Sequence, residues 1–306
     1  MTMLITLVLV TFFVFMAFKL ISGDPVTAML GTEATPEQAE NLRNELGLND
    51  PVLVQYFRWA GNFITGDMGM SYSYRMSVSS MIAEKIPVTL IMALMAFVIM
   101  TVVSIPLGIF TAEHKGGIAD RTIYVINQII MAIPPFFSGI LITFLFGRVF
   151  KLFTPGGFIS PSKDFGGFLG YMFFPALAIA LPKISMTVKL LRTSVLKEGN
   201  NDYVRTAYSK GLNTRGVLYG HVLKNAILPV VTFLGMCLTD MIAGSIIVEQ
   251  VFGIPGLGRI LLTSIFNRDY PVVMAIIVII AGMVLLVNAL VDILYSKLDP
   301  RISVDE

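Results

Sequence analysis

The stretch VTLIMALMAFVIMTVVSIPLGIFT at residues 88–111 contains no charged residue and is long enough to cross a membrane as a helix. A helix rises about 1.5 Å per residue, so roughly 20 apolar residues cross a hydrocarbon core of about 30 Å. Five further stretches meet this criterion, and we predict an all-α, polytopic membrane protein with six transmembrane helices. The six predicted spans are 3–21, 88–111, 122–146, 171–191, 226–248 and 272–294.

The composition of the whole chain agrees with this prediction. Of its 306 residues, 55% are hydrophobic and 14% are charged, against roughly 45–50% and 25% in soluble domains. The 22 basic and 20 acidic residues nearly balance, so the chain lacks the basic face of a nucleic-acid-binding protein. A single cysteine, Cys237, and two histidines argue against a disulfide framework and against a cysteine- or histidine-rich metal centre.

Basic residues are unevenly distributed between the two sides of the predicted membrane domain. Lysine and arginine are concentrated in the loops after the second, fourth and sixth spans, whereas the long segment after the first span is acidic. Cytoplasmic loops carry the excess of basic residues, so we predict that both termini are cytoplasmic. The predicted parts are a first transmembrane helix (1–21), an extracytoplasmic helical cap (22–86), a core of five transmembrane helices (87–299) with a cytoplasmic loop at 193–225, and a cytoplasmic tail (300–306).

The predicted cap carries clear signals for helix ends. Thr35 and Gln38 enclose Pro36 in the pattern of a capping box, and Gly47 is placed to end that helix. Asp50-Pro51 opens a second short helix that runs through Trp59. We therefore expect a small folded unit that helps to dock an external partner, although a segment that only rigidifies the first two spans would show the same signals.

Prolines interrupt several of the predicted spans. Each removes a backbone donor and kinks its helix, which is tolerated where neighbouring helices or a water-filled cavity satisfy the freed carbonyl groups. Many such prolines only improve packing, but the Pro134-Pro135 pair in the middle of a span suggests a transport pathway. The residues predicted to line it are Asn127, Gln128, Pro134, Pro135, Ser138 and Asp240, and the other interrupting prolines are Pro106, Pro175, Pro182 and Pro229.

Ionisable residues at membrane depth are costly, and each therefore suggests a function. Asp240 lies near the middle of the fifth predicted span, Glu249 closes that span, and Asp292 lies in the sixth. Asp240 fits equally well as a pathway residue and as a contact to a partner subunit. Lys183 is available to pair with one of these acids, and the sequence leaves open which one.

The cytoplasmic loop contains the segment Asn201-Asp-Tyr-Val-Arg-Thr-Ala-Tyr-Ser-Lys-Gly-Leu212. Asn200 or Asn201 can cap a short helix, Gly211 supplies a left-handed stop, and a second short helix starts near Asn213. We expect a compact knob with the small Ala207 at its crest. Because a membrane helix holds each end of the knob, it can move only with those helices, as a mechanical coupling element must.

Here the chain resembles a known family. Arg205-Thr206-Ala207, Gly211 and Ile227-Leu228-Pro229 resemble the Glu-Ala-Ala, Gly, Ile-x-Leu-Pro coupling motif of ATP-binding-cassette (ABC) importer permeases. The departures from the consensus look like the dipeptide, oligopeptide and nickel branch, and in particular the B-type permease subunit of oligopeptide importers. Further motifs of this branch are Ser22-Gly-Asp-Pro25, Gly47-Leu-Asn-Asp-Pro51, Gly66-Asp-Met-Gly69, Glu249-Gln-Val-Phe-Gly-Ile-Pro-Gly-Leu-Gly258, Asn267-Arg-Asp-Tyr-Pro271 and Leu298-Asp-Pro-Arg301.

The resemblance implies a type I ABC importer permease fold in a bacterial inner membrane. It also implies a homologous second permease, two cytoplasmic ATPase subunits, an extracytoplasmic substrate-binding protein and surrounding lipid, but no nucleic acid. The chain has no G-x-x-x-x-G-K-[ST] phosphate loop, so we expect ATP and Mg on the partner subunits, no cofactor, metal ligand or catalytic residue here, and no enzymatic activity. The implied coupling residues are Tyr203, Arg205, Thr206, Ala207, Lys210, Gly211, Leu228 and Pro229.

Other readings remain open at this stage. A secondary transporter should show an internal repeat, which we do not find, and a channel would not explain the coupling knob. No hydrolase motif of the G-x-S-x-G or H-E-x-x-H type occurs. We expect di- or oligopeptides as cargo, with nickel or another metal chelate as the alternative.

Overall fold

The computed structural model describes residues 2–21, 26, 30, 35–45 and 47–298, which are helical apart from turns, loops and one isolated bridge. The motif at 22–25, most of the motif that begins at Leu298 and the predicted tail at 300–306 lie outside the described residues. The chain divides into two compact units, one formed by residues 1–88 and 255–285 and the other by 89–254 and 286–306.

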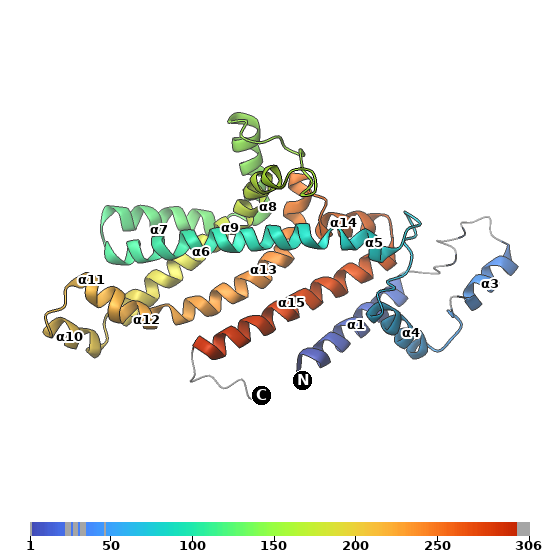
Figure 1. The fold of residues 1–306 in the computed structure, drawn as a ribbon, viewed down its shortest axis with the longest axis horizontal. Helices are drawn as coiled ribbons and strands as arrows, with labels where there is room; N and C mark the ends of the chain where they lie inside the picture. The colour runs from blue at the N-terminus through green and yellow to red at the C-terminus, as the bar shows by residue number, and fades with distance from the viewer. Residues whose placement is uncertain (1, 22–25, 27–29, 31–34, 46, 299–306) are drawn as a thin grey trace. The chain divides into compact units, whose positions relative to one another are not determined.

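The first unit contains the N-terminal helix, the predicted cap and the segment that leads into the last span (Figure 1). Thr35 and Gln38 form the predicted capping box: each accepts a hydrogen bond from the other's backbone N–H, at 3.1 and 3.3 Å. Its helices are α1 (Thr2–Ile21), α3 (Pro36–Glu45), α4 (Val52–Ile64), α5 (Val78–Ala83), α14 (Leu257–Phe266) and the first part of α15 (Tyr270–Leu298).

The second unit is built around one long helix, α9 (Phe165–Glu198), which packs against α7, α8, α12 and α13. Small and apolar side chains such as Ala176, Ala180 and Val188 are buried along it. The other elements are α6 (Ile86–Glu113), α7 (Ile118–Met131), α8 (Pro135–Ile142), the π-helix η1 (Thr143–Val149), α10 (Asp202–Ser209), α11 (Thr214–Val217), the π-helix η2 (Leu218–Val222), α12 (Leu223–Ala226) and α13 (Leu228–Phe252).

The described helices account for the predicted spans, with one difference. Five are long and apolar enough to cross a membrane, and a sixth span exists if the bent pair formed by residues 118–131 and 135–149 counts as one. The predicted span at 122–146, which the sequence analysis expects to be interrupted at the proline pair, is broken rather than only kinked, because the chain turns by 105° between α7 and α8. Pro134 and Pro135 lie at this turn, where a proline cannot supply the donor that a continuous helix needs.

The other prolines differ in their effect on the helices. Pro106 lies inside α6, and Pro175 and Pro182 lie inside α9, as predicted. The prediction that Pro229 interrupts a span is wrong, because α13 begins at Leu228 and places Pro229 in its first turn. A proline there costs nothing, since the first N–H groups of a helix have no intrahelical acceptor.

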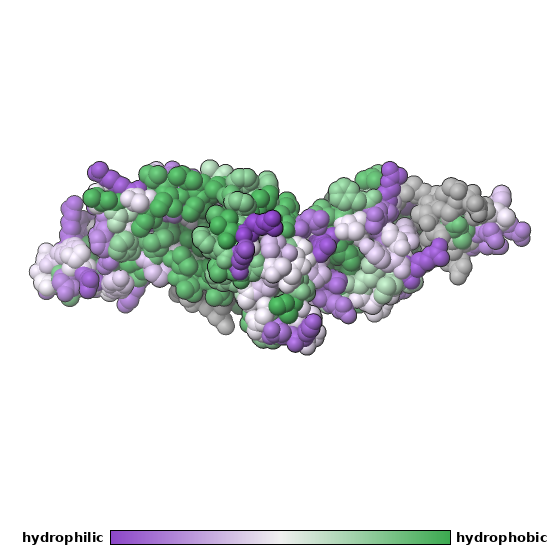
Figure 2. All heavy atoms as spheres, turned by 90° about the horizontal axis from the view of Figure 1, so that it is seen from above, coloured by the Kyte–Doolittle hydropathy of each residue, from purple (hydrophilic) through white to green (hydrophobic). Residues whose placement is uncertain are grey.

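Hydropathy divides the surface of the second unit. Figure 2 shows a broad hydrophobic surface over its spans and hydrophilic residues at the end that carries α10 and α11. The unit therefore has the surface of a membrane-embedded bundle with a polar element at one end.

Candidate functional site

The short helix α10 forms the predicted knob, and its end is fixed by the predicted glycine. Gly211 has φ = +82°, a left-handed conformation that favours glycine. The N–H of Gly211 donates to the carbonyl oxygen of Tyr208 at 2.9 Å, and the N–H of Leu212 donates to that of Ala207 at 3.4 Å. This pair of bonds is a Schellman motif. Asn213 then caps α11 by accepting a hydrogen bond from the N–H of Gly216 at 2.8 Å.

The orientation of α10 differs from the prediction. Ala207 is only 5% exposed and Val204 is also buried, so the prediction that Ala207 stands at the crest is wrong. The helix packs this face against α11, and the small side chain lets the two helices approach. The exposed face instead carries Arg205, Thr206 and Ser209, while Lys210 is exposed just after the helix.

Tyr203 ties the knob to the helices on both sides of it. Its hydroxyl donates to Glu198 Oε1 at the end of α9 (2.7 Å) and accepts from Asn225 Nδ2 in α12 (3.2 Å). Burial, together with the bond to the Glu198 carboxylate, raises the pKa of Tyr203. These two bonds therefore join the start of α10 to both α9 and α12.

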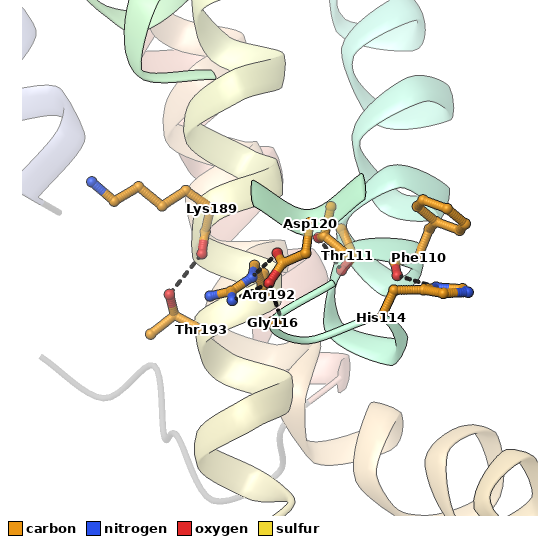
Figure 3. A network of polar contacts seen from close by, with 9 residues as sticks. Phe110, Thr111, His114, Gly116, Asp120, Lys189, Arg192 and Thr193 are labelled. Atoms are coloured by element: carbon orange, nitrogen blue, oxygen red, sulfur yellow. Dashed lines mark hydrogen bonds and ion pairs between the residues drawn. The ribbon is translucent and has the colours of Figure 1, made fainter. Parts of the chain in front are cut away.

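An ion pair between a half-buried arginine and a buried carboxylate lies about one and a half turns before the end of α9. Arg192 donates from Nε to Asp120 Oδ1 at 2.6 Å and from an Nη group to Asp120 Oδ2 at 2.7 Å. The same Oδ2 accepts the N–H of Gly116 at 2.8 Å, in the turn between α6 and α7. Figure 3 shows Arg192 reaching from α9 to Asp120 beside this turn. The pair therefore fastens α9 to the α6–α7 hairpin.

Sequence reasoning missed this pair. Asp120 lies in the first turn of α7, where an acid is favoured by the helix dipole, and that local role gives no hint of a partner. Arg192 lies at the edge of the basic segment before the predicted cytoplasmic loop, which gives no hint of a partner either. The partners are 72 positions apart, so no short-range pattern joins them.

A second ion pair lies in the middle of two spans. Lys183 of α9 donates to Asp240 of α13 at 2.6 Å, which answers the question that the sequence left open. Lys183 is mostly covered, whereas the Asp240 side chain is 61% exposed. Thr239, the residue directly before Asp240, donates to Asn288 of α15 at 2.7 Å. Two neighbouring polar residues of α13 therefore bond to two different helices.

The other predicted pathway residues lie in different surroundings. Asn127 and Ser138 are buried within the chain, whereas Gln128 and Pro134 are exposed and Pro135 is half-buried. Asn127 and Gln128 line a cavity of about 60 Å³ together with Arg192. The structure thus brings two of the predicted polar residues to the Asp120–Arg192 pair, while Asp240 pairs with Lys183.

A third polar cluster lies in the first unit. Asp269 is completely buried and accepts hydrogen bonds from the Ser71 hydroxyl and from the N–H groups of Tyr72 (3.0 Å) and Ser73 (3.3 Å). Burial, and then the negative charge of Asp269, raises the pKa of Tyr72 to about 12. The carboxylate therefore fixes the loop that follows Gly69.

We expect the substitution Asp269→Ala to loosen this loop. It removes the acceptor for three donors, and losing hydrogen bonds to a charged group costs about 2 kcal/mol. Hydrogen–deuterium exchange at residues 71–76 should become faster by more than tenfold. Asp67→Ala is the matched control, because Asp67 is exposed and accepts one backbone N–H, from Gly69. Unchanged exchange in the Asp269 variant would show that the carboxylate does not hold the loop.

Comparison with known proteins places these features in context. Residues 104–304 match the family described as binding-protein-dependent transport system inner membrane component, and residues 1–93 match its N-terminal region family. Similar proteins include a probable peptide ABC transporter permease of Sinorhizobium fredii, 31% identical over 294 residues, which are 96% of this chain and 94% of the relative. An oligopeptide transport system permease of Bacillus subtilis is 36% identical over 296 residues (96% and 94%). A putative peptide transport system permease of Brucella abortus is 35% identical over 299 residues (98% and 95%).

Proposed function

We propose that this chain, which belongs to the family of binding-protein-dependent transport system inner membrane components, moves oligopeptides across the membrane as a permease of an ATP-driven importer. It is a multi-pass membrane protein of a transport family. The family match favours an importer permease over a secondary transporter or a channel. The relatives named above are peptide permeases, which favours a peptide cargo over a nickel chelate.

The observation that carries the coupling part of the proposal is the attachment of α10. Tyr203 joins this helix to α9 and α12 through two hydrogen bonds, while Arg205 and Thr206 remain exposed on its outer face. We propose that this outer face docks into a groove of an ATPase subunit. Leu228 and Pro229, at the start of α13, would then carry the displacement into the span, since α12 contacts α13.

The remaining parts of the assembly are proposed from the family and the charge distribution. A homologous second permease, two ATPase subunits that bind ATP and Mg, and an external binding protein would complete the importer, and this chain would hold no cofactor and catalyse no reaction. From the loops rich in Lys and Arg we propose that α10 and both termini are cytoplasmic, and that residues 22–86 are on the outer side.

Co-purification and uptake test the proposed function. We expect stoichiometric ATPase subunits with the purified permease, and ATP-dependent uptake of a labelled oligopeptide into proteoliposomes that carry the binding protein outside. A labelled nickel chelate should not accumulate under the same conditions. Uptake of the chelate without uptake of the peptide would contradict the proposal.

We propose that the Lys183–Asp240 pair borders the translocation pathway, together with Asn127, Gln128, Pro134, Pro135 and Ser138. Charged residues at the middle of spans face a bundle interior or a water-filled cavity, and a zwitterionic peptide needs such polar surroundings.

Asp240→Asn leaves Lys183 without its counter-charge, and we expect several-fold slower peptide uptake with unchanged ATPase assembly. Asp292→Asn is the control, because Asp292 is exposed on α15; its uptake per molecule should not change. Equal uptake by the Asp240→Asn and Asp292→Asn variants would contradict the proposal that Asp240 borders the pathway.

A further inference from the structure

Helix α4 has one side that no described part of the chain covers. Leu53, Phe57 and Ile64 are 59%, 69% and 85% exposed, and at 100° per residue they fall within about 40° of one another around the helix. We call these three residues the apolar strip. Arg58 and Asn62, four residues apart, lie on another side and are also exposed. The helix is therefore amphipathic on its exposed surface.

The remaining side of α4 packs against the transmembrane helix α1. The Tyr56 ring lies edge-on to Phe12, and its hydroxyl is 3.0 Å from Thr11 Oγ1. Lys19 donates to Gln55 Oε1 at 2.7 Å. Thr11 lies ten residues before the end of α1, which is about 15 Å along the helix axis. Tyr56 therefore contacts α1 well before its Ile21 end, which places this part of α4 beside the predicted span.

We propose that α4 lies in the lipid interface at the Ile21 end of α1, with the apolar strip among the acyl chains and Arg58 and Asn62 toward water. Leu9, Phe13 and Leu20 of α1 are exposed as well, so α1 also carries an apolar side that no described residue covers. Apolar residues on one face and polar residues on the other are typical of an interfacial helix, and tyrosine and tryptophan are enriched at this depth. The partner is therefore the lipid surface, and α4 is not part of a cap in water.

The single tryptophan of the chain makes this placement measurable. Trp59 is the only tryptophan, and its ring lies 5.6 Å from that of Phe15 of α1, tilted by 38°. The purified full-length chain is placed in nanodiscs of phosphatidylethanolamine and phosphatidylglycerol, with or without brominated phosphatidylcholine. We expect brominated lipid to remove most of the Trp59 emission and aqueous iodide to remove little of it.

Two variants in a Trp59→Phe background separate the sides of the helix. The indole of Phe57→Trp should be quenched by brominated lipid and protected from iodide, whereas that of Asn62→Trp should be quenched by iodide. Equal access of iodide to both positions would put α4 in water and overturn the proposal. Protection of position 57 from both quenchers would mean that protein, such as a second copy of the chain, covers the strip, which also overturns it. The native Trp59 measurement decides the depth if either variant fails to fold.

Discussion

Replacing Ala207 with leucine is expected to abolish substrate-stimulated ATP hydrolysis while the permease stays folded in the membrane. Ala207 is buried in a helix that contacts α11, so three added carbons must displace neighbouring side chains. Overpacking of this kind costs about 1–3 kcal/mol, which a whole membrane bundle survives. The same energy shifts a two-state equilibrium by about 5- to 150-fold, enough to displace a short helix from its docking position.

Two further variants make the Ala207 experiment specific. Ala207→Ser keeps the side chain small and should retain stimulated hydrolysis. Gly211→Val forces a β-branched residue into the left-handed conformation of Gly211, at a cost of about 1–2 kcal/mol, and should resemble Ala207→Leu. The measurements are ATPase rate with and without loaded binding protein, and permease content of the membrane. Full stimulation in Ala207→Leu would show that α10 does not couple the ATPase to transport.

Local signals predicted a large part of this structure. The capping box at Thr35, the left-handed stop at Gly211 and the start of α11 at Asn213 all appear where the sequence placed them, because each depends on residues within one or two turns. The apolar runs likewise located the spans, although α9 extends from Phe165 to Glu198, well beyond its apolar centre at 171–191. The helix includes polar residues at its C-terminal end, and hydropathy identifies only its apolar part.

Features that depend on distant contacts could not be predicted in the same way. The sequence identified Ala207 as small, but whether a small residue marks an exposed crest or a close helix contact depends on where α11 packs. The partner of Asp240 was one of several possible cations until α9 and α13 were placed together. The 105° turn at Pro134 was expected only as a kink, because the size of a bend is set by the helices around it.

The Asp120–Arg192 pair leads to the second large expected effect. It lies on α9 between the mid-span Lys183 and the end of the helix at Glu198, to which α10 is tied. Close by, Gly108 of α6 meets Leu191 so closely that an added Cβ would lie 3.0 Å from the Leu191 Cβ. The α6–α7 hairpin and α9 are therefore fastened just above the coupling helix. A displacement of α10 should move them as one body while the pair is intact.

Arg192→Ala is expected to uncouple ATP hydrolysis from uptake and to lower the melting temperature. It leaves the buried Asp120 carboxylate with only the N–H of Gly116, a loss of about 2–3 kcal/mol. Lys189→Ala is the matched control, since Lys189 lies one turn earlier on α9 and points away from Asp120 (Figure 3).

A double variant tests whether the two side chains act together. Because the effects of substituting two residues in contact do not add, Asp120→Ala combined with Arg192→Ala should be no worse than either alone. Transport per ATP should fall at least about tenfold in Arg192→Ala, as a loss of 1.4 kcal/mol or more predicts, and stay unchanged in Lys189→Ala. Additive losses in the double variant would show that the two side chains act independently and that the pair does not transmit the motion of α10.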